Sequence, residues 1–261
     1  MDYKKQGFSI VDLFLESEIK NLENTLLDLL KMQAKKIRIN VSENDNLDSL
    51  CSKIQNIYPK ALDEVFGMFR NSSVGHKLAS NNLLQEYSMK FLETTNPVII
   101  SGPSFFINIK SNKTRKYTWH SEQNWYPKRR NFLNVWCPII YNRPENESMA
   151  MLIGSQNKDW FYFSEYTGYD GNFDPSANVQ YEIPDNFIKD YTEVIPKVDK
   201  GQAIFFDGRL VHRSVNTQFE HPVYTIVFRA FDYTNDLTLS SNWADIPYNR
   251  QSLGFPNINI D

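Results

Sequence analysis

Apolar residues in the first third of the chain recur every three or four positions, the spacing of one face of an α-helix. A short alternating run over residues 7–15 comes first, and the next segment places on one face Ile19, Leu22, Leu26, Leu29 and Leu30. Similar stripes follow over residues 50–57 and 61–69, with breaks at Pro59 and at residues 71–73. We therefore predict a strand, an amphipathic helix, and further helices up to about residue 96.

From residue 97 the pattern changes to short β-prone runs separated by Asn, Gly and Pro. The runs include PVIIS, SFFINIK, KYTWHSE, FLNVWCPIIY, AMLIGS, QAIFFDG and VYTIVFRAF. Such runs are typical of an antiparallel sandwich or barrel. We predict a mainly β protein with α content, a single domain in which a helical N-terminal part, residues 1–96, packs on a β core, residues 97–261.

The least regular part of that core is an aromatic-rich loop over residues 155–187. Seven aromatic residues lie between positions 159 and 173, among Gly and Asp. Rings of this size are costly to leave in water. We expect residues 159–173 to close over a binding site as a lid. The alternative is that the rings pack beneath the loop as a satellite core.

Charge and composition narrow the class of protein. Lys and Arg number 28 and Asp and Glu 31, so the net charge is −3 and no global positive field attracts nucleic acid. Two cysteines cannot build a disulfide framework, the N-terminus lacks the apolar stretch of a signal peptide, and no run approaches a membrane span. We predict a cytoplasmic enzyme or ligand binder with no membrane segment.

The chain has four histidines, and two of them are candidates for chemistry. His76 lies at a predicted helix start and His221 in a turn before a proline, so we assign both structural roles. His120 and Glu122 lie two residues apart at the end of KYTWHSE, and side chains two apart on a strand point to the same side. The alternative for this pair is two side chains facing water, because H-x-E arises easily by chance.

A third candidate ligand, His212, follows the buried run AIFF later in the chain. Two histidines and one carboxylate form the facial triad that holds non-haem Fe(II) with positions left open. A zinc hydrolase also uses such ligands, but its helical H-E-x-x-H spacing is absent from the sequence. The residues therefore favour an iron site made of His120, Glu122 and His212.

At these residues the sequence resembles the phytanoyl-CoA dioxygenase-like family of Fe(II)/2-oxoglutarate oxygenases, which are built on a double-stranded β-helix (jelly-roll or cupin-like) core. The likeness covers nearly the whole chain and rests on the order of several short motifs. They are the Gly-Phe opening over residues 7–16, Trp-His-x-acid over 119–122, the apolar strand with a Trp at 135–136, a degraded Gly-Ser-Gln segment over 146–156, and His212 after the distal strand.

The resemblance implies roles for five residues. His120, Glu122 and His212 would be the iron ligands, with Glu where the family more often has Asp. Ser214, two residues past the distal histidine, would hydrogen-bond the carboxylate of 2-oxoglutarate, and Trp136 would line the cosubstrate pocket.

The arginine that binds the far carboxylate of 2-oxoglutarate in this family is displaced. The resemblance expects it at position 223, which is Val223. Strand alternation puts Arg229 on the same side as Val223, but roughly 20 Å further along a regular strand. We name Arg229 as the candidate anchor. The alternatives are a surface ion pair for Arg229 and another cation as the anchor.

The implied reaction is hydroxylation of a C–H bond in a small-molecule substrate by O₂, with conversion of 2-oxoglutarate to succinate and CO₂. The carboxylate of Glu122 argues against the halogenating relatives, which leave that position empty for chloride. Basic residues on both sides of the first metal segment suggest an anionic substrate, although a solvated rim is the alternative. They are Arg115, Lys116, Lys128, Arg129 and Arg130.

Two other hypotheses stay open. The first is a β-helix protein without 2-oxoglutarate turnover, such as a cupin-like isomerase or a ligand-binding module, and Val223 is its best support. The second is a structural or assembly protein whose aromatic segment, residues 160–173, is a protein interface. That hypothesis predicts a tight oligomer and no metal.

Overall fold

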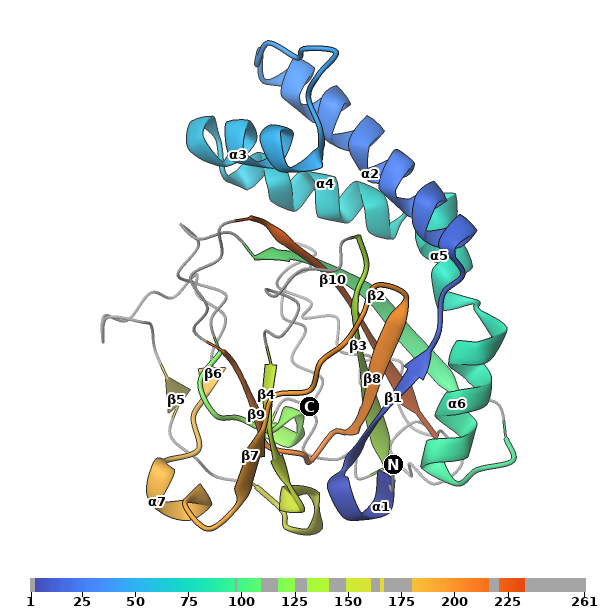
Figure 1. Ribbon diagram of the computed structural model, residues 1–261, viewed down its shortest axis with the longest axis vertical. Coiled ribbons are helices and arrows are strands. Elements are labelled where there is room, and N and C mark those ends of the chain that lie inside the picture. The colour runs from blue at the N-terminus through green and yellow to red at the C-terminus, as the bar shows by residue number, and fades with distance from the viewer. Residues whose placement is uncertain are drawn as a thin grey trace, which may run out of the picture.

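The computed structural model describes residues 3–96, 98–108, 117–124, 131–140, 149–160, 165–166, 180–215 and 221–232. The chain opens with a short helix and a strand, and five helices follow (Figure 1). These elements are α1 (Tyr3–Gln6), β1 (Phe8–Asp12), α2 (Glu16–Lys36), α3 (Leu47–Ile57), α4 (Lys60–Arg70), α5 (Ser73–Ala79) and α6 (Asn82–Leu92). The opening strand and the run of helices therefore lie where the periodicity predicts them.

Side-chain caps explain where three of these helices begin. Asn46, Ser72 and Asn81 each precede a helix and accept a hydrogen bond from a backbone N–H of its first turn. Such caps satisfy donors that have no partner inside the helix. The apolar stripes of α2 and α4 turn inward, and Leu26, Leu30 and Val65 are completely buried.

A five-stranded antiparallel sheet lies beneath the helices, with the strand order β1-β8-β3-β10-β2. The added strands are β2 (Ile99–Asn108), β3 (Phe132–Pro138), β8 (Gln202–Asp207) and β10 (Val223–Phe231). Alternate residues face the helices, as strand geometry requires. Leu133, Val135, Phe205, Ile226 and Phe228 share one buried cluster with α2, α3 and α4. The other face of this sheet is therefore the one available for a site.

A smaller antiparallel sheet packs against that second face. Its strand order is β7 (Thr192–Val194), β4 (Met149–Ile153), β9 (His212–Ser214). Met149 and Met151 of β4 form a cluster with Ile204 and Phe206 of β8. The described remainder consists of η2 (Glu122–Asn124), η4 (Ser155–Asn157), β5 (Glu165–Tyr166), β6 (Gln180–Tyr181) and α7 (Asp185–Ile188).

The architecture is thus a mixture of helices and antiparallel sheets, and the expectation of a mainly β protein understates the helices. Among the described strands, the two larger sheets remain separate and do not close into a barrel. In the described part of the chain, no helix is both long enough and apolar enough to cross a membrane.

Candidate metal centre

Backbone hydrogen bonds bring the two candidate histidine ligands together from distant parts of the sequence. The N–H of His120 donates to the carbonyl of His212 at 3.0 Å, and the N–H of His212 donates to the carbonyl of His120 at 2.9 Å. His212 begins β9. The segment before His120 is fastened to the same strand, because the N–H of Ser214 donates to the carbonyl of Tyr117 at 2.9 Å. The two imidazoles are therefore placed by the backbone.

Glu122 reaches the site by a different route from the one that the sequence suggests. We expected residues 116–122 to form a strand end with His120 and Glu122 on one face. That expectation is wrong in detail: His120 makes an isolated bridge, and Glu122 opens the 3₁₀ helix η2. The hydroxyl of Ser121 donates a hydrogen bond to the carbonyl of Gly208, and within the described residues the backbone does not pair with β9 beyond His120. The turn, and not strand alternation, directs Glu122 toward the histidines.

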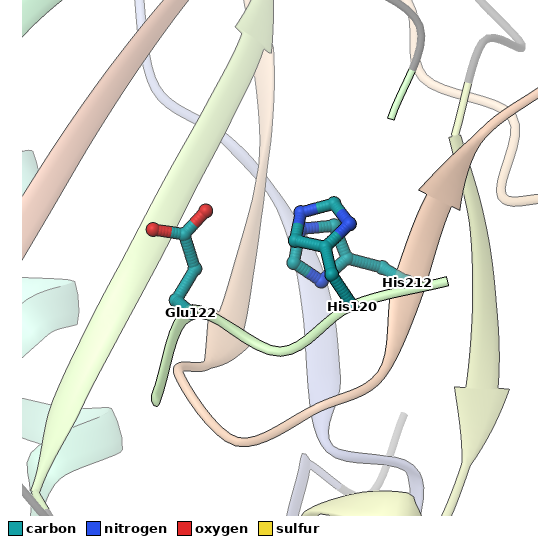
Figure 2. A group of neighbouring side chains, drawn as sticks. All are labelled: His120, Glu122 and His212. Atoms are coloured by element: carbon teal, nitrogen blue, oxygen red, sulfur yellow. The ribbon is translucent and has the colours of Figure 1, made fainter. Parts of the chain in front are cut away.

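The three side chains converge on one point (Figure 2). His120, Glu122 and His212 each offer a ligand atom, and these atoms all lie within 4.8 Å of one another. Nδ1 of His120 is 2.7 Å from the carbonyl oxygen of Thr118, and Nδ1 of His212 is 3.0 Å from that of Leu210. A carbonyl only accepts, so each Nδ1 carries the proton and each Nε2 is the unprotonated nitrogen. This donor set fits a divalent metal ion such as Fe(II).

Burial and neighbouring charged groups together set the protonation states of the three side chains. It lowers the pKa of His120, and it lowers the pKa of His212 to about 3, with a further contribution from His120 beside it. Burial alone would raise the pKa of Glu122, but Arg229 and the two histidines more than offset this and hold that pKa below its usual range. The site therefore offers two neutral imidazoles and one carboxylate, which are the forms that bind a metal.

Arg229 lies at the metal site. Its Nη2 and Nε donate to Oε2 of Glu122 at 2.9 and 3.1 Å. The side chains of Arg229 and Glu122 are 21% and 12% exposed, so the ion pair is largely shielded from water. As strand alternation predicts, Arg229 lies on the inner face of β10. Its expected displacement along the strand from position 223 does not prevent it from reaching Glu122.

The other two residues expected at the site lie on strands that line it. Trp136 is on β3, directly opposite Val227 of β10 and Ile204 of β8, and packs against the cluster between the two sheets. Ser214 lies on β9, two residues past His212, and its Oγ accepts a hydrogen bond from the backbone N–H of Tyr117 at 3.2 Å.

A buried polar residue that is not among the candidates from the sequence, Asn134, also lies on β3. It lies two residues before Trp136 on β3, where strand alternation gives both side chains the same face. An asparagine is unusual in an otherwise apolar strand such as FLNVWCP. Its spacing of two residues from Trp136 could have predicted that Asn134 shares the inner face of this strand.

Part of the predicted lid is a satellite core. Trp160 is completely buried, and its Nε1–H donates to the carbonyl of Ser155 at 2.8 Å. It packs in a cluster that contains Leu152, Ile183 and Val211. The lid expectation is therefore wrong for Trp160. Residues 161–164 and 167–179 lie outside the described residues, as do the basic residues 115, 116 and 128–130 and the motif residues 146–148.

Solved structures share this fold. The chain is similar to the epimerase SnoN in complex with Fe3+, alpha ketoglutarate and nogalamycin RO, at 12% identity and a TM-score of 0.56 over 88% of this chain and 80% of that one. It is also similar to EctD from S. alaskensis with bound Fe, at 18% identity and a TM-score of 0.55 over 89% and 75%. A third is the carbocyclase SnoK from nogalamycin biosynthesis, at 13% and 0.52 over 91% and 87%. At these identities the likeness concerns the fold alone.

A buried His-Glu-His centre beside two packed antiparallel sheets is an arrangement typical of non-haem metal enzymes. The family model described as Phytanoyl-CoA dioxygenase (PhyH) matches residues 3–218, and the chain belongs to this family. No curated protein matches the chain in sequence. Family membership and the metal centre together support an iron- and 2-oxoglutarate-dependent enzyme that acts on a small molecule.

Proposed function

We propose that the chain is a non-haem Fe(II)- and 2-oxoglutarate-dependent dioxygenase that hydroxylates a C–H bond of a small-molecule substrate. In this proposal residues 1–261 form one oxygenase domain with a double-stranded β-helix core. The observation that carries the proposal is the triad of His120, Glu122 and His212, whose ligand atoms lie within 4.8 Å of one another. Two of the three are neutral imidazoles with Nδ1 already bonded to backbone carbonyls.

Each triad residue has a stated role in this proposal. His120 and His212 would hold Fe(II) through Nε2, and the carbonyls of Thr118 and Leu210 keep the two rings in the required orientation. Both bonds from Arg229 fall on Oε2 of Glu122, so we assign Oε1 to the metal. Iron bound by these three residues would supply the centre at which 2-oxoglutarate and O₂ react.

Arg229 is our proposed anchor for 2-oxoglutarate. Val223 is apolar and buried, so it cannot pair with a carboxylate. Arg229 is on the same strand and already bonds a metal ligand. A guanidinium has five donors in a planar fork, so Arg229 can share its N–H groups between Glu122 and the carboxylate of a second ligand. Ser214 and Trp136 are the further cosubstrate contacts in this proposal.

The substrate in this proposal is a small anionic molecule, on the evidence of the basic residues that flank the first metal segment in the sequence. Hydroxylation is the outcome we propose because Glu122 keeps a carboxylate at the third ligand position. Other reactions occur on this fold, since the similar structures include an epimerase and a carbocyclase.

The test is a titration of the purified protein with Fe(II) in the absence of O₂, followed by 2-oxoglutarate. We expect a single Fe(II) site, a visible absorption that appears only when 2-oxoglutarate is added, and release of succinate once O₂ is admitted. His120→Ala should abolish all three signals. His76→Ala is the matched control, because His76 is exposed on α5.

The results separate the competing hypotheses. Iron binding without the absorption and without succinate would support a β-helix protein that does not use 2-oxoglutarate. Failure of the wild-type protein to bind Fe(II) would overturn the metal assignment. Succinate release without a hydroxylated product, across a panel of acyl thioesters, sugar nucleotides and small metabolites, would overturn hydroxylation and leave the cofactor assignment in place.

A further inference from the structure

Asn134 is a polar side chain enclosed within the protein beside the metal centre. It is 1% exposed, and within the described residues neither Oδ1 nor Nδ2 has a hydrogen-bond partner. A buried amide without partners is costly, and native proteins retain few of them. Its neighbours along β3, Leu133 and Val135, belong to the helix-side cluster. The side chain of Asn134 therefore lies on the opposite face, toward the small sheet.

The strand register places Asn134 between two residues that contact the triad. Directly opposite it on β8 is Phe206, whose ring centroid lies 4.9 Å from that of His212. Directly opposite it on β10 is Arg229, which donates two hydrogen bonds to Glu122. Residues directly opposite one another in an antiparallel ladder point to the same side. Phe206, Asn134 and Arg229 thus form a row that borders the metal site.

We propose that Asn134 is a cosubstrate-binding residue whose Nδ2–H donates a hydrogen bond to a carboxylate oxygen of 2-oxoglutarate. The inference rests on the proposed function, because it assumes the cosubstrate assigned there. It adds a contact that neither the sequence motifs nor the metal triad identifies.

The chemistry of the row favours a carboxylate over an apolar or cationic group. Arg229 places a positive charge on one side of Asn134. The N–H groups of the amide and of the guanidinium can therefore donate hydrogen bonds to the same anion. Once Fe(II) is bound to Glu122, the charge of Arg229 is no longer offset by that carboxylate and would repel a cationic ligand. An apolar ligand would leave the amide as unsatisfied as it is without a ligand, at the cost that accompanies such a group.

The experiment measures binding of keto acids to the Fe(II)-loaded protein without O₂, from the ligand-dependent absorption and from the shift in Tm. Asn134→Leu has nearly the shape of asparagine but no donor. We expect it to weaken 2-oxoglutarate binding roughly ten- to a hundredfold, the effect of one hydrogen bond to a charged group. Affinity for Fe(II) alone should stay within about twofold, and Tm without ligand should not fall, because the removed amide has no partner.

A second variant and a matched control test whether the loss of binding comes from the amide donor of Asn134. Asn134→Asp keeps the size and polarity of the side chain but places an anion in the row, so it should weaken 2-oxoglutarate binding at least as much. Ser88→Ala is the control. Ser88 is also buried and its Oγ also lacks a partner, but it lies on α6 among the helix-side core residues. It should leave keto acid binding unchanged.

A second ligand identifies which carboxylate Asn134 binds. 2-Oxovalerate has the same keto acid end as 2-oxoglutarate and lacks its far carboxylate. If Asn134→Leu weakens binding of both ligands equally, the contact is to the keto acid end. If it weakens only 2-oxoglutarate, the contact is to the far carboxylate.

The inference fails separately from the proposed function. If the wild-type protein gives the 2-oxoglutarate signal and both Asn134 variants bind 2-oxoglutarate as tightly as the wild type, Asn134 makes no such bond. If the wild-type protein gives no 2-oxoglutarate signal at all, the proposed function itself is wrong.

Discussion

The ion pair between Arg229 and Glu122 couples the stability of the protein to its metal. Arg229→Met removes the guanidinium while keeping an unbranched side chain. Without metal, the variant leaves Glu122 as a buried charge beside two neutral imidazoles, and breaking a buried pair typically costs about 3–5 kcal/mol. Because the arginine side chain is 21% exposed, we expect the lower end, about 3 kcal/mol. In a chain of this size that corresponds to a fall in Tm of roughly 6–12 °C.

The metal-loaded variant should behave differently. A bound divalent cation neutralises Glu122 in place of Arg229, so the loss of stability should shrink to about 1 kcal/mol. By linkage, the variant then binds the metal about 2 kcal/mol more tightly than the wild type, which is roughly thirtyfold. Chemical denaturation with and without Mn(II) measures both quantities, and Mn(II) avoids oxidation during the experiment.

Two comparisons make this prediction refutable. In a double-mutant cycle with Glu122→Gln, the metal-free coupling energy between the two sites should be about 2–3 kcal/mol. Arg209→Met is the control, because Arg209 pairs with Asp207, which is not part of the triad. The stability that this variant loses should be the same with and without Mn(II). If Arg229→Met destabilises the protein equally in both conditions, or if the cycle is additive, the two charges do not stabilise one another.

Three further predictions concern other described residues. His120→Ala and His212→Ala should each weaken Mn(II) binding at least a hundredfold in calorimetry and leave the far-ultraviolet circular dichroism unchanged. Trp160→Ala should lower the free energy of unfolding by about 3–5 kcal/mol in urea denaturation, because the ring is completely buried; a change below about 1 kcal/mol would exclude it from the core. Burial raises the pKa of Cys51 to about 12 and raises that of Cys137 as well, so neither thiol should react with a disulfide reagent at pH 8 until urea unfolds the protein; rapid labelling of the native protein would contradict this.

The sequence predicted the helices and strands whose own residues show a periodic pattern of apolar positions. The stripe of apolar residues from Ile19 to Leu30 specifies α2, and alternation across VYTIVFRAF separates the helix face of β10 from its inner face. The same alternation was enough to place Arg229 inside. Both signals work because they depend on the geometry of one element and require no knowledge of its neighbours.

What the sequence did not predict depends on contacts between distant segments. The pairing of β10 with β2 is interrupted by an irregularity between Val227 and Arg229, which an argument from a regular strand cannot include. The path of Glu122 depends on the bond from Ser121 to Gly208, a residue far along the chain. Trp160 reads as a lid residue in the sequence because its partners come from three other segments. Burial by contacts with distant segments leaves no periodic pattern of apolar residues in the sequence.

The two faces of β10 also bear on how this chain can change over evolution. Ile226 and Phe228 fill the helix-side core, while Arg229 alternates with them and lies toward Glu122. A strand repeats every two residues, so inserting or deleting one residue before Phe228 exchanges the faces, turning Phe228 toward the triad of His120, Glu122 and His212 and Arg229 into the apolar core. Substitutions can alter one face at a time, whereas a single-codon insertion in this strand damages core and chemistry together. We therefore expect length changes among related chains to fall outside Val223–Phe231, where they leave unchanged which face each side chain of β10 occupies.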